Sequence, residues 1–178
     1  QEFVRGKHAR KDVQEFSLRL MDNILTLNNE LVNRSYRHGP YRAFRINDPK
    51  PRQIHKASVR DRLLHHAIYR VLYPFFDRIF TSDSFSCRLN KGTHRALNRF
   101  YAFACRVSRN HTRVGWGLKC DIKKFFENID HTVLMNVLKG YVSDVGILWL
   151  LRDVINSFSA KHGGVGLPLG NLTSQLLV

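Results

Sequence analysis

The stretch from Trp116 to His131 holds the residues best suited to chemistry. Within it, Asp121 ends a short apolar segment, and the aromatic pair Phe125 and Phe126 follows a few residues later. A carboxylate at the end of a strand, beside an aromatic ring, suits a Mg²⁺ site, because this ion takes hard oxygen ligands and leaves positions for water and substrate phosphates. The alternative is that Asp121 only caps the turn that follows it. The motifs elsewhere in the chain decide between the two.

Three motifs resemble those of a known family. The residues from Asp121 to His131, Asp-Ile-Lys-Lys-Phe-Phe-Glu-Asn-Ile-Asp-His, closely resemble the first catalytic palm motif of bacterial reverse transcriptases, which include group II intron and retron-type enzymes. Upstream, Ser84 to Ala96 is similar to the fingers motif of these enzymes, and downstream Gly166 to Gln175 is similar to the next palm motif. With Lys50 to Arg62, the motifs cover most of residues 41 to 178 in the family's order.

The resemblance implies an α+β fold, that of the fingers and the N-terminal part of the palm of a right-hand polymerase. Such a fold is mostly helical, with a fingertip β-hairpin and part of the antiparallel palm sheet. We expect the fingers and an N-terminal helix in residues 1–113 and a partial palm in residues 114–178, as one continuous unit. The chain ends at Val178 before the family's Tyr-x-Asp-Asp turn, so we expect a segment of a longer polymerase that is inactive alone.

The implied reaction is RNA-directed DNA synthesis, in which a DNA or RNA primer 3′ hydroxyl attacks the α-phosphate of a deoxynucleoside triphosphate (dNTP) on an RNA template. Two Mg²⁺ ions, with Mn²⁺ as an alternative, would stabilise the attacking and leaving oxygens. By resemblance, Asp121 is the catalytic residue and ligands both ions, and the Ile122 carbonyl is a further ligand. Phe126 matches the steric gate that excludes the 2′ hydroxyl of ribonucleotides.

Other motif residues match the nucleotide pocket and the nucleic-acid contacts of the family. Arg52 matches the fingertip arginine that binds the triphosphate, a role for which a guanidinium fork is well shaped. Lys50 is a weaker match, and a charged edge strand is its alternative explanation. The predicted template contacts are Arg88, Lys91, Arg60 and Arg62. For the last two, a structural ion pair is an equal alternative.

The downstream motif departs from the commonest pattern. Many relatives have Gln-Gly and Ser-Pro where this chain has Leu169-Gly170 and Ser174-Gln175, and we expect Leu169 and Gly170 to lie beside the nucleotide. The departure resembles the variant in reverse transcriptases of diversity-generating retroelements, which copy template adenines inaccurately. Shape without a hydrogen bond separates close analogues by only about 1 to 3 kcal/mol. Error-prone synthesis by the complete enzyme is therefore an expectation.

Charge and cysteine content bound the partners and the compartment. The net charge is +15, and residues 1–113 hold 23 of the 29 Lys and Arg residues, as expected for a part that grips a polyanion; a generally soluble basic surface is the alternative. Three scattered cysteines suit neither a zinc site nor a disulfide framework, which favours a cytoplasmic location. The sequence has no long apolar run, predicts no membrane association and identifies no accessory protein.

Local patterns predict the elements that position these residues. Apolar residues at spacings of three and four predict one helix from about Lys11 to Asn33. Residues 41–46 and 52–56, on either side of a turn at 47–51, predict a β-hairpin. Ser58 begins a capping box and a helix that Pro74 should end or kink, and His65 and His66 are expected on that helix's surface.

Further along, a helix is predicted from about Thr93 to Ser108, with Leu97, Phe100 and Val107 among its inward residues. Asp130 is expected to cap one helix, and Ser143 or Asp144 the next, which runs to about Asn156; both would cover the back of the palm sheet. Residues 161–166 predict a hairpin turn that leads into the motif with Leu169.

A second class of function is also open. The basic first part would equally serve a non-catalytic RNA-binding protein, such as a polymerase-derived scaffold or a maturase-like factor. A strand ending in a Tyr-x-Asp-Asp-type turn after Val178 would distinguish the enzyme from the scaffold.

Overall fold

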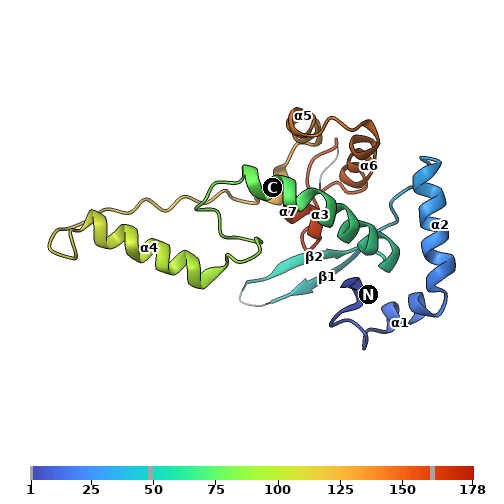
Figure 1. The fold of residues 1–178 in the computed structure, drawn as a ribbon, viewed down its shortest axis with the longest axis horizontal. Helices are drawn as coiled ribbons and strands as arrows, with labels where there is room; N and C mark the ends of the chain where they lie inside the picture. Colours follow the sequence, from blue (N-terminus) through green and yellow to red (C-terminus); the bar gives the residue numbers. More distant parts are fainter. Residues whose placement is uncertain (1, 48–49, 161–162) are drawn as a thin grey trace. The chain divides into compact units, whose positions relative to one another are not determined.

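The computed structural model describes residues 2–47, 50–160 and 163–178, which form two compact units. One unit comprises the residues up to Tyr69 together with Lys124–Val178, and the other comprises Arg70–Lys123. The described residues form helices and a two-stranded antiparallel sheet, so the predicted α+β class is confirmed (Figure 1). The division into fingers at 1–113 and palm at 114–178 stays a prediction.

The N-terminal helical segment is broken. The predicted single helix consists of α1 (Lys11–Leu18) and α2 (Leu20–Val32), separated at Arg19, whose φ and ψ of −123° and 43° are not helical. At the break, the Asn23 side-chain amide donates to the Phe16 carbonyl over 2.9 Å and satisfies a group that the helix would otherwise bond. The prediction of one continuous helix was therefore wrong, because apolar spacing does not report such a local cap.

A small apolar core fixes the beginning of the chain, the short helix η1 (Glu2–Val4) and α1, in the first unit. Phe3, from η1, is buried with Val13 and Val59, and Val4, Phe16 and Leu63 pack around them. The core thus joins η1 and α1 to the beginning of α3 (Val59–Ile79).

The predicted hairpin is confirmed. Strands β1 (Arg42–Ile46) and β2 (Arg52–Lys56) pair antiparallel, with Arg42 opposite Lys56 and Ile46 opposite Arg52. Of the predicted turn, residues 48 and 49 lie outside the described residues.

Helix α3 begins as the capping box predicts, because the Ser58 hydroxyl accepts from the Asp61 backbone N–H at 3.1 Å. Of the two predicted effects of Pro74, an end of the helix is excluded because Pro74 lies inside it, and a kink stays a prediction. A proline removes one backbone hydrogen bond, and the burial of neighbouring Leu72, Tyr73 and Phe76 offsets this loss.

Two capped helices follow in the first unit, as predicted. Asp130 accepts from Val133 N–H at 2.9 Å and starts α5 (His131–Tyr141). Asp144 accepts from Ile147 N–H at 2.8 Å and starts α6 (Val145–Asn156). The two helices pack together, and α7 (Leu172–Leu176) follows near the end of the chain. The palm sheet that α5 and α6 were expected to cover is absent from the described residues.

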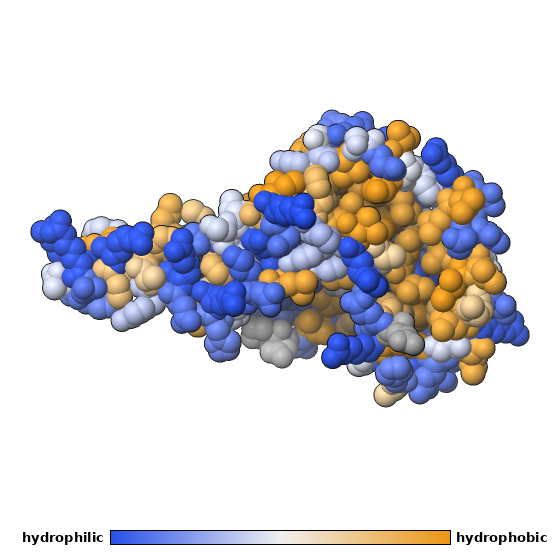
Figure 2. All heavy atoms as spheres, in the orientation of Figure 1, coloured by the Kyte–Doolittle hydropathy of each residue, from blue (hydrophilic) through white to orange (hydrophobic). Residues whose placement is uncertain are grey.

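The unit of residues 70–123 contains α4 (Thr93–Val107), as predicted, but its apolar side is not inward. Leu97, Phe100 and Val107 are 58%, 69% and 61% exposed, so that prediction was wrong. Spacing predicted which residues share a face of the helix but not what would cover that face, and apolar and hydrophilic side chains both lie on the helix surface (Figure 2).

The predicted palm strand before Asp121 is also not formed. Residues 114–122 are exposed and make no ladder with any described residue. A β-strand needs a partner for its backbone N–H and C=O groups, and apolar residues alone cannot supply one.

A buried carboxylate joins the loop before β1 to the start of α3. Asp61 is fully buried, and it accepts from the Tyr36 hydroxyl at 2.8 Å, the Ser58 hydroxyl at 2.6 Å and the Gly39 N–H at 3.2 Å. Burial, together with the Asp61 charge, raises the pKa of the Tyr36 hydroxyl well above its ordinary value, so this hydroxyl stays a donor.

His65 was expected on the helix surface, but it is only 2% exposed. The His38 Nδ1 lies 2.6 Å from the Gly39 carbonyl, which can only accept, so in neutral His38 the Nε2 is the acceptor. His65 Nε2 therefore donates to it over 2.9 Å, and the Thr173 hydroxyl donates to His65 Nδ1 over 2.6 Å. The spacing of apolar residues did not predict the burial of His65, because a polar side chain can be buried when hydrogen-bond partners such as His38 and Thr173 are present.

Burial and the neighbouring His38 lower the pKa of His65 from 6.5 to about 4. Between pH 6.5 and about pH 4, His65 therefore stays neutral in the folded chain but is protonated in the unfolded chain. The contribution of His65 to the free energy of unfolding is therefore fully present above pH 6.5 and is lost as the pH falls towards 4.

We expect Tyr36→Phe to destabilise the first unit by about 1.5 to 3 kcal/mol, because it removes a hydrogen bond to a buried charge. Urea unfolding followed through Trp149 fluorescence, in a Trp116→Phe background, reports on this unit. Tyr101→Phe, which alters an exposed tyrosine on α4, should shift the midpoint little. Equal midpoints for the Tyr36 and Tyr101 variants would contradict the role of the hydrogen bond.

Candidate functional site

A cavity of about 600 Å³ lies in the first unit. Four separate segments line it: residues 51–53 and 55 of the hairpin, 124–127, 158–160, and 167 with 169. Its size falls within the range of about 300 to 1,000 Å³ that is usual for small-molecule sites.

Three of the five residues predicted for a nucleotide pocket line this one cavity. They are Arg52, Phe126 and Leu169, which come from three segments far apart in the sequence. Gly170 adjoins Leu169 without lining the cavity, and Lys50 is exposed outside it. The geometry thus groups the predicted residues, while their roles stay predictions.

Backbone contacts dock the Leu169 segment on strand β2. The His55 N–H donates to the Leu169 carbonyl at 3.0 Å, and the Asn171 side-chain amide donates to the His55 carbonyl at 3.0 Å. Between them, Gly170 has a φ of +102°, and a Cβ there would lie 2.8 Å from Ile54 Cγ2. Glycine is required because both the backbone conformation and the close approach exclude a side chain.

Phe126 is positioned by the short helix η2 (Phe125–Asn128). The residue before this helix, Lys124, has left-handed φ and ψ of 53° and 42°, which turns the chain into η2. The Phe126 carbonyl then accepts from the Leu167 N–H at 2.7 Å, which holds the two walls of the cavity together.

The cavity has charged and aromatic lining. Arg52 is exposed, and Lys124 makes an ion pair of 3.2 Å with Glu127. The His55 ring packs edge-on against Phe158, with ring centroids 4.5 Å apart, and burial lowers the pKa of His55. Sequence analysis did not select His55 or Phe158: His55 lies in the stretch from Lys50 to Arg62 but matches no functional residue of the family there, and Phe158 lies outside the motifs.

Asp121 and Ile122 belong to the other unit and are exposed. The Asp121 carboxylate is the kind of oxygen ligand that Mg²⁺ takes. In the part of the chain that the structure describes, however, no three His, Cys, Asp or Glu residues gather closely enough to hold a metal ion. The described residues therefore do not complete a Mg²⁺ site.

The four predicted template contacts all bind protein groups. Arg60 pairs with Glu30 and Asp61, and Arg62 pairs with Asp12 at 2.5 Å, as the ion-pair alternative expected. These contacts are structural, and any role with a template stays a prediction.

The other two predicted contacts lie in the unit of residues 70–123. Arg88, whose side chain is 8% exposed, donates to the Asp77 carboxylate at 2.7 Å and to the Thr81 carbonyl at 2.7 Å. Lys91 donates to the Ser82 carbonyl at 2.6 Å. The Arg88 hydrogen bond lowers the pKa of Asp77, which keeps that carboxylate charged.

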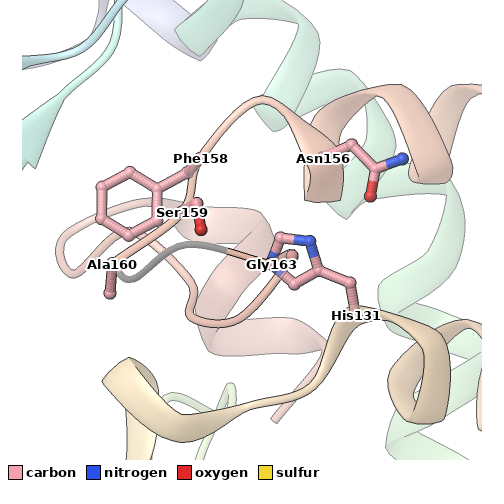
Figure 3. A pocket seen from close by; sticks show the side chains of 7 residues that line it. His131, Asn156, Phe158, Ser159, Ala160 and Gly163 are labelled. Atoms are coloured by element: carbon pink, nitrogen blue, oxygen red, sulfur yellow. The ribbon is translucent and has the colours of Figure 1, made fainter.

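A second cavity of about 520 Å³ shares residues 158–160 with the first (Figure 3). His131 and Asn156 also line it, and the His131 ring bonds the Gly166 carbonyl over 2.7 Å. Of the turn predicted at 161–166, residues 161 and 162 lie outside the described residues, and Gly163 and Gly164 line this cavity. The Ala160 N–H donates to the Val165 carbonyl at 2.9 Å.

No protein-family model matches the chain. It is 27% identical over 161 residues to the putative COX1/OXI3 intron 1 protein of Saccharomyces cerevisiae. It is 24% identical over 136 residues to the group II intron-encoded protein LtrA of Lactococcus lactis. The chain is related to group II intron-encoded proteins.

These relationships cover most of this chain but only part of each relative. The alignments span 85% of the chain and 18% of the yeast intron protein, and 74% of the chain and 22% of LtrA. The nuclear intron maturase 1, mitochondrial, of Arabidopsis thaliana is 28% identical over 58% of the chain and 13% of its own length.

The helices in the part of the chain that the structure describes include none with the length and apolar character that a membrane span requires.

We expect Gly170→Ala to weaken the docking of the Leu169 segment on β2 by about 1 to 3 kcal/mol, because it strains the backbone and meets Ile54. Hydrogen exchange at the His55 amide should accelerate by roughly five- to hundred-fold, since this amide is released when the segment opens. Gly140→Ala, in α5 with open space around the glycine, is the control and should leave this amide unchanged. Unchanged protection in the Gly170 variant would refute the constraint.

Proposed function

We propose that the chain is part of an RNA-directed DNA polymerase and that its first unit binds a dNTP in the cavity lined by Arg52, Phe126 and Leu169. The proposed reaction of the complete protein is nucleotidyl transfer to a primer 3′ hydroxyl on an RNA template. The relationship to group II intron-encoded proteins supports the family, and the cavity supports the substrate.

The observation that carries the proposal is the grouping of these three residues. Each was selected separately, by its resemblance to a residue that touches the incoming nucleotide. The chain then brings them together through the hairpin, η2 and the Leu169 segment, which are joined by backbone hydrogen bonds.

Each residue has a proposed contact. The Arg52 guanidinium binds triphosphate oxygens through two parallel hydrogen bonds. The Phe126 ring lies where a 2′ hydroxyl would be, and so excludes ribonucleotides by overlap. Leu169 packs beneath the nucleotide and recognises it by shape alone, without a hydrogen bond. Error-prone synthesis by the complete enzyme is therefore also part of the proposal.

Asp121 is proposed as one carboxylate ligand of Mg²⁺ in the complete polymerase, with the Ile122 carbonyl beside it. The described residues do not supply the rest of the coordination shell. Nucleotide binding by the first unit does not depend on this part of the proposal, and it can be measured on the 178-residue chain.

We expect Arg52→Gln to weaken dATP binding to the 178-residue chain by about tenfold or more, since a charge-assisted hydrogen bond contributes roughly 1.5 to 3 kcal/mol. Isothermal titration calorimetry measures the dissociation constant. Arg45→Gln removes an equal charge from the same hairpin at an exposed position that does not line the cavity, and should have little effect. Equal losses in both variants would mean that only net charge matters.

Phe126→Ala should change the selectivity for the sugar. We expect the ratio of ATP to dATP affinity to rise by at least about tenfold, because the space that a ring denies to the 2′ hydroxyl becomes available. Phe44→Ala, which alters a half-exposed phenylalanine of β1 that does not line the cavity, is the control. If the ratio stays constant in the Phe126 variant, this ring is not the gate.

A second candidate is a non-catalytic RNA-binding factor. The observation in its favour is that the relatives include an intron maturase. RNA that binds to the chain with strong salt dependence, without measurable dATP binding, would favour this candidate over the polymerase. Specific dATP binding that depends on Arg52 would favour the polymerase.

A further inference from the structure

We propose that Phe158, backed by His55, is the base-contacting wall of the cavity and takes the nucleobase on its aromatic face. The inference rests on the proposed nucleotide site and assigns it a specificity-determining residue that lies outside the stretches resembling the family's motifs. Its grounds are the fixed orientation of the Phe158 ring and the distribution of charged and aromatic residues around the cavity.

Two neighbouring rings hold Phe158 in place. The Tyr41 ring meets it edge-on at 5.6 Å between centroids and 89° between planes, and the His55 ring meets it at 4.5 Å and 62°. Tyr41 is itself anchored, because its hydroxyl bonds Ser157 at 3.0 Å. A ring fixed in this way loses little conformational entropy on binding, which favours it as a stacking surface.

The half-buried Phe158 still borders open space. It lines the 600 Å³ cavity together with Phe126 and Leu169. The ring is therefore accessible to a ligand in this cavity while its contacts with Tyr41 and His55 hold it in place.

The cavity has a cationic part and an aromatic part, as a nucleotide has a triphosphate and a base. Arg52 and His55 are three residues apart on β2, about 10 Å along a strand, and both line this cavity although strand side chains at this spacing leave on opposite faces. Arg52 supplies the charge at one end of this span, and the His55–Phe158 pair supplies the rings at the other. A dNTP whose triphosphate lies on Arg52 can therefore present its base to Phe158.

Burial lowers the pKa of His55, so this ring is neutral near pH 7. A neutral imidazole continues the aromatic wall without adding a charge beside the base. Lys124, the other cation of the described lining, is paired with Glu127, so Arg52 supplies the positive charge for the phosphates and Phe158 supplies the contact to the base.

The experiment compares three ligands on the 178-residue chain: dATP, dTTP and inorganic tripolyphosphate. Phe158→Leu keeps an apolar side chain but removes the aromatic face. We expect roughly tenfold weaker dATP binding, a smaller loss for dTTP, whose base is smaller, and unchanged tripolyphosphate binding. Phe44→Leu, which alters a half-exposed phenylalanine of β1 outside the cavity, should leave all three affinities unchanged.

A second variant keeps the test decisive if Phe158→Leu does not fold. Phe158→Trp preserves an aromatic wall, and dATP should quench its added fluorescence, whereas tripolyphosphate should not. Quenching absent from Phe158→Trp, or equal to that of Phe44→Trp, would overturn the inference.

The outcomes separate the inference from the proposed function. If dATP and tripolyphosphate bind to the unaltered chain but Phe158→Leu weakens both equally, or neither, then Phe158 does not contact the base and the nucleotide site stands. If the unaltered chain binds neither ligand, the proposed function fails, and the inference fails with it.

Discussion

The buried carboxylate of Asp61 is the constraint on which the first unit depends. A buried charge is tolerated only when its oxygens are hydrogen-bonded, and Asp61 obtains its donors from Tyr36, Ser58 and Gly39. These bonds tie the loop before β1 to the start of α3, which follows β2 directly. Both ends of the hairpin are thereby fixed, and Arg52 is carried on a strand whose base cannot shift freely.

A series of hydrogen bonds between polar side chains links the loop next to this carboxylate to helix α7 near the end of the chain. His38 follows Tyr36 in the loop, and its ring accepts from His65, which in turn accepts from Thr173 of α7. Because α7 begins just after Gly170, the loop, α3 and the Leu169 segment share one polar interior. Residues separated by more than a hundred positions can line one cavity because such non-local bonds hold their segments in place.

Local signals in the sequence predicted local structure well. The hairpin and the helices capped by Asp130 and Asp144 each follow from turn formers or a capping carboxylate within a few residues. Sequence patterns failed to predict the structure where a contact with a residue distant in the sequence decides whether a side chain is buried or a strand forms. Burial of His65 needs Thr173, and a strand before Asp121 needs a partner that the described residues do not supply. Likewise, Phe158 acquires its place only through ring contacts with Tyr41 and His55.

The hydrogen bond between His55 and Leu169 has a mechanical consequence. Hairpins over a ligand site often act as flaps that swing on a hinge while the opposite wall stays still. Here strand β2 and the Leu169 segment are two walls of the same cavity, and they are bonded directly to each other. Swinging β2 away would break both bonds or carry the Leu169 wall with it. These bonds therefore favour a preformed cavity over one that the hairpin opens and closes.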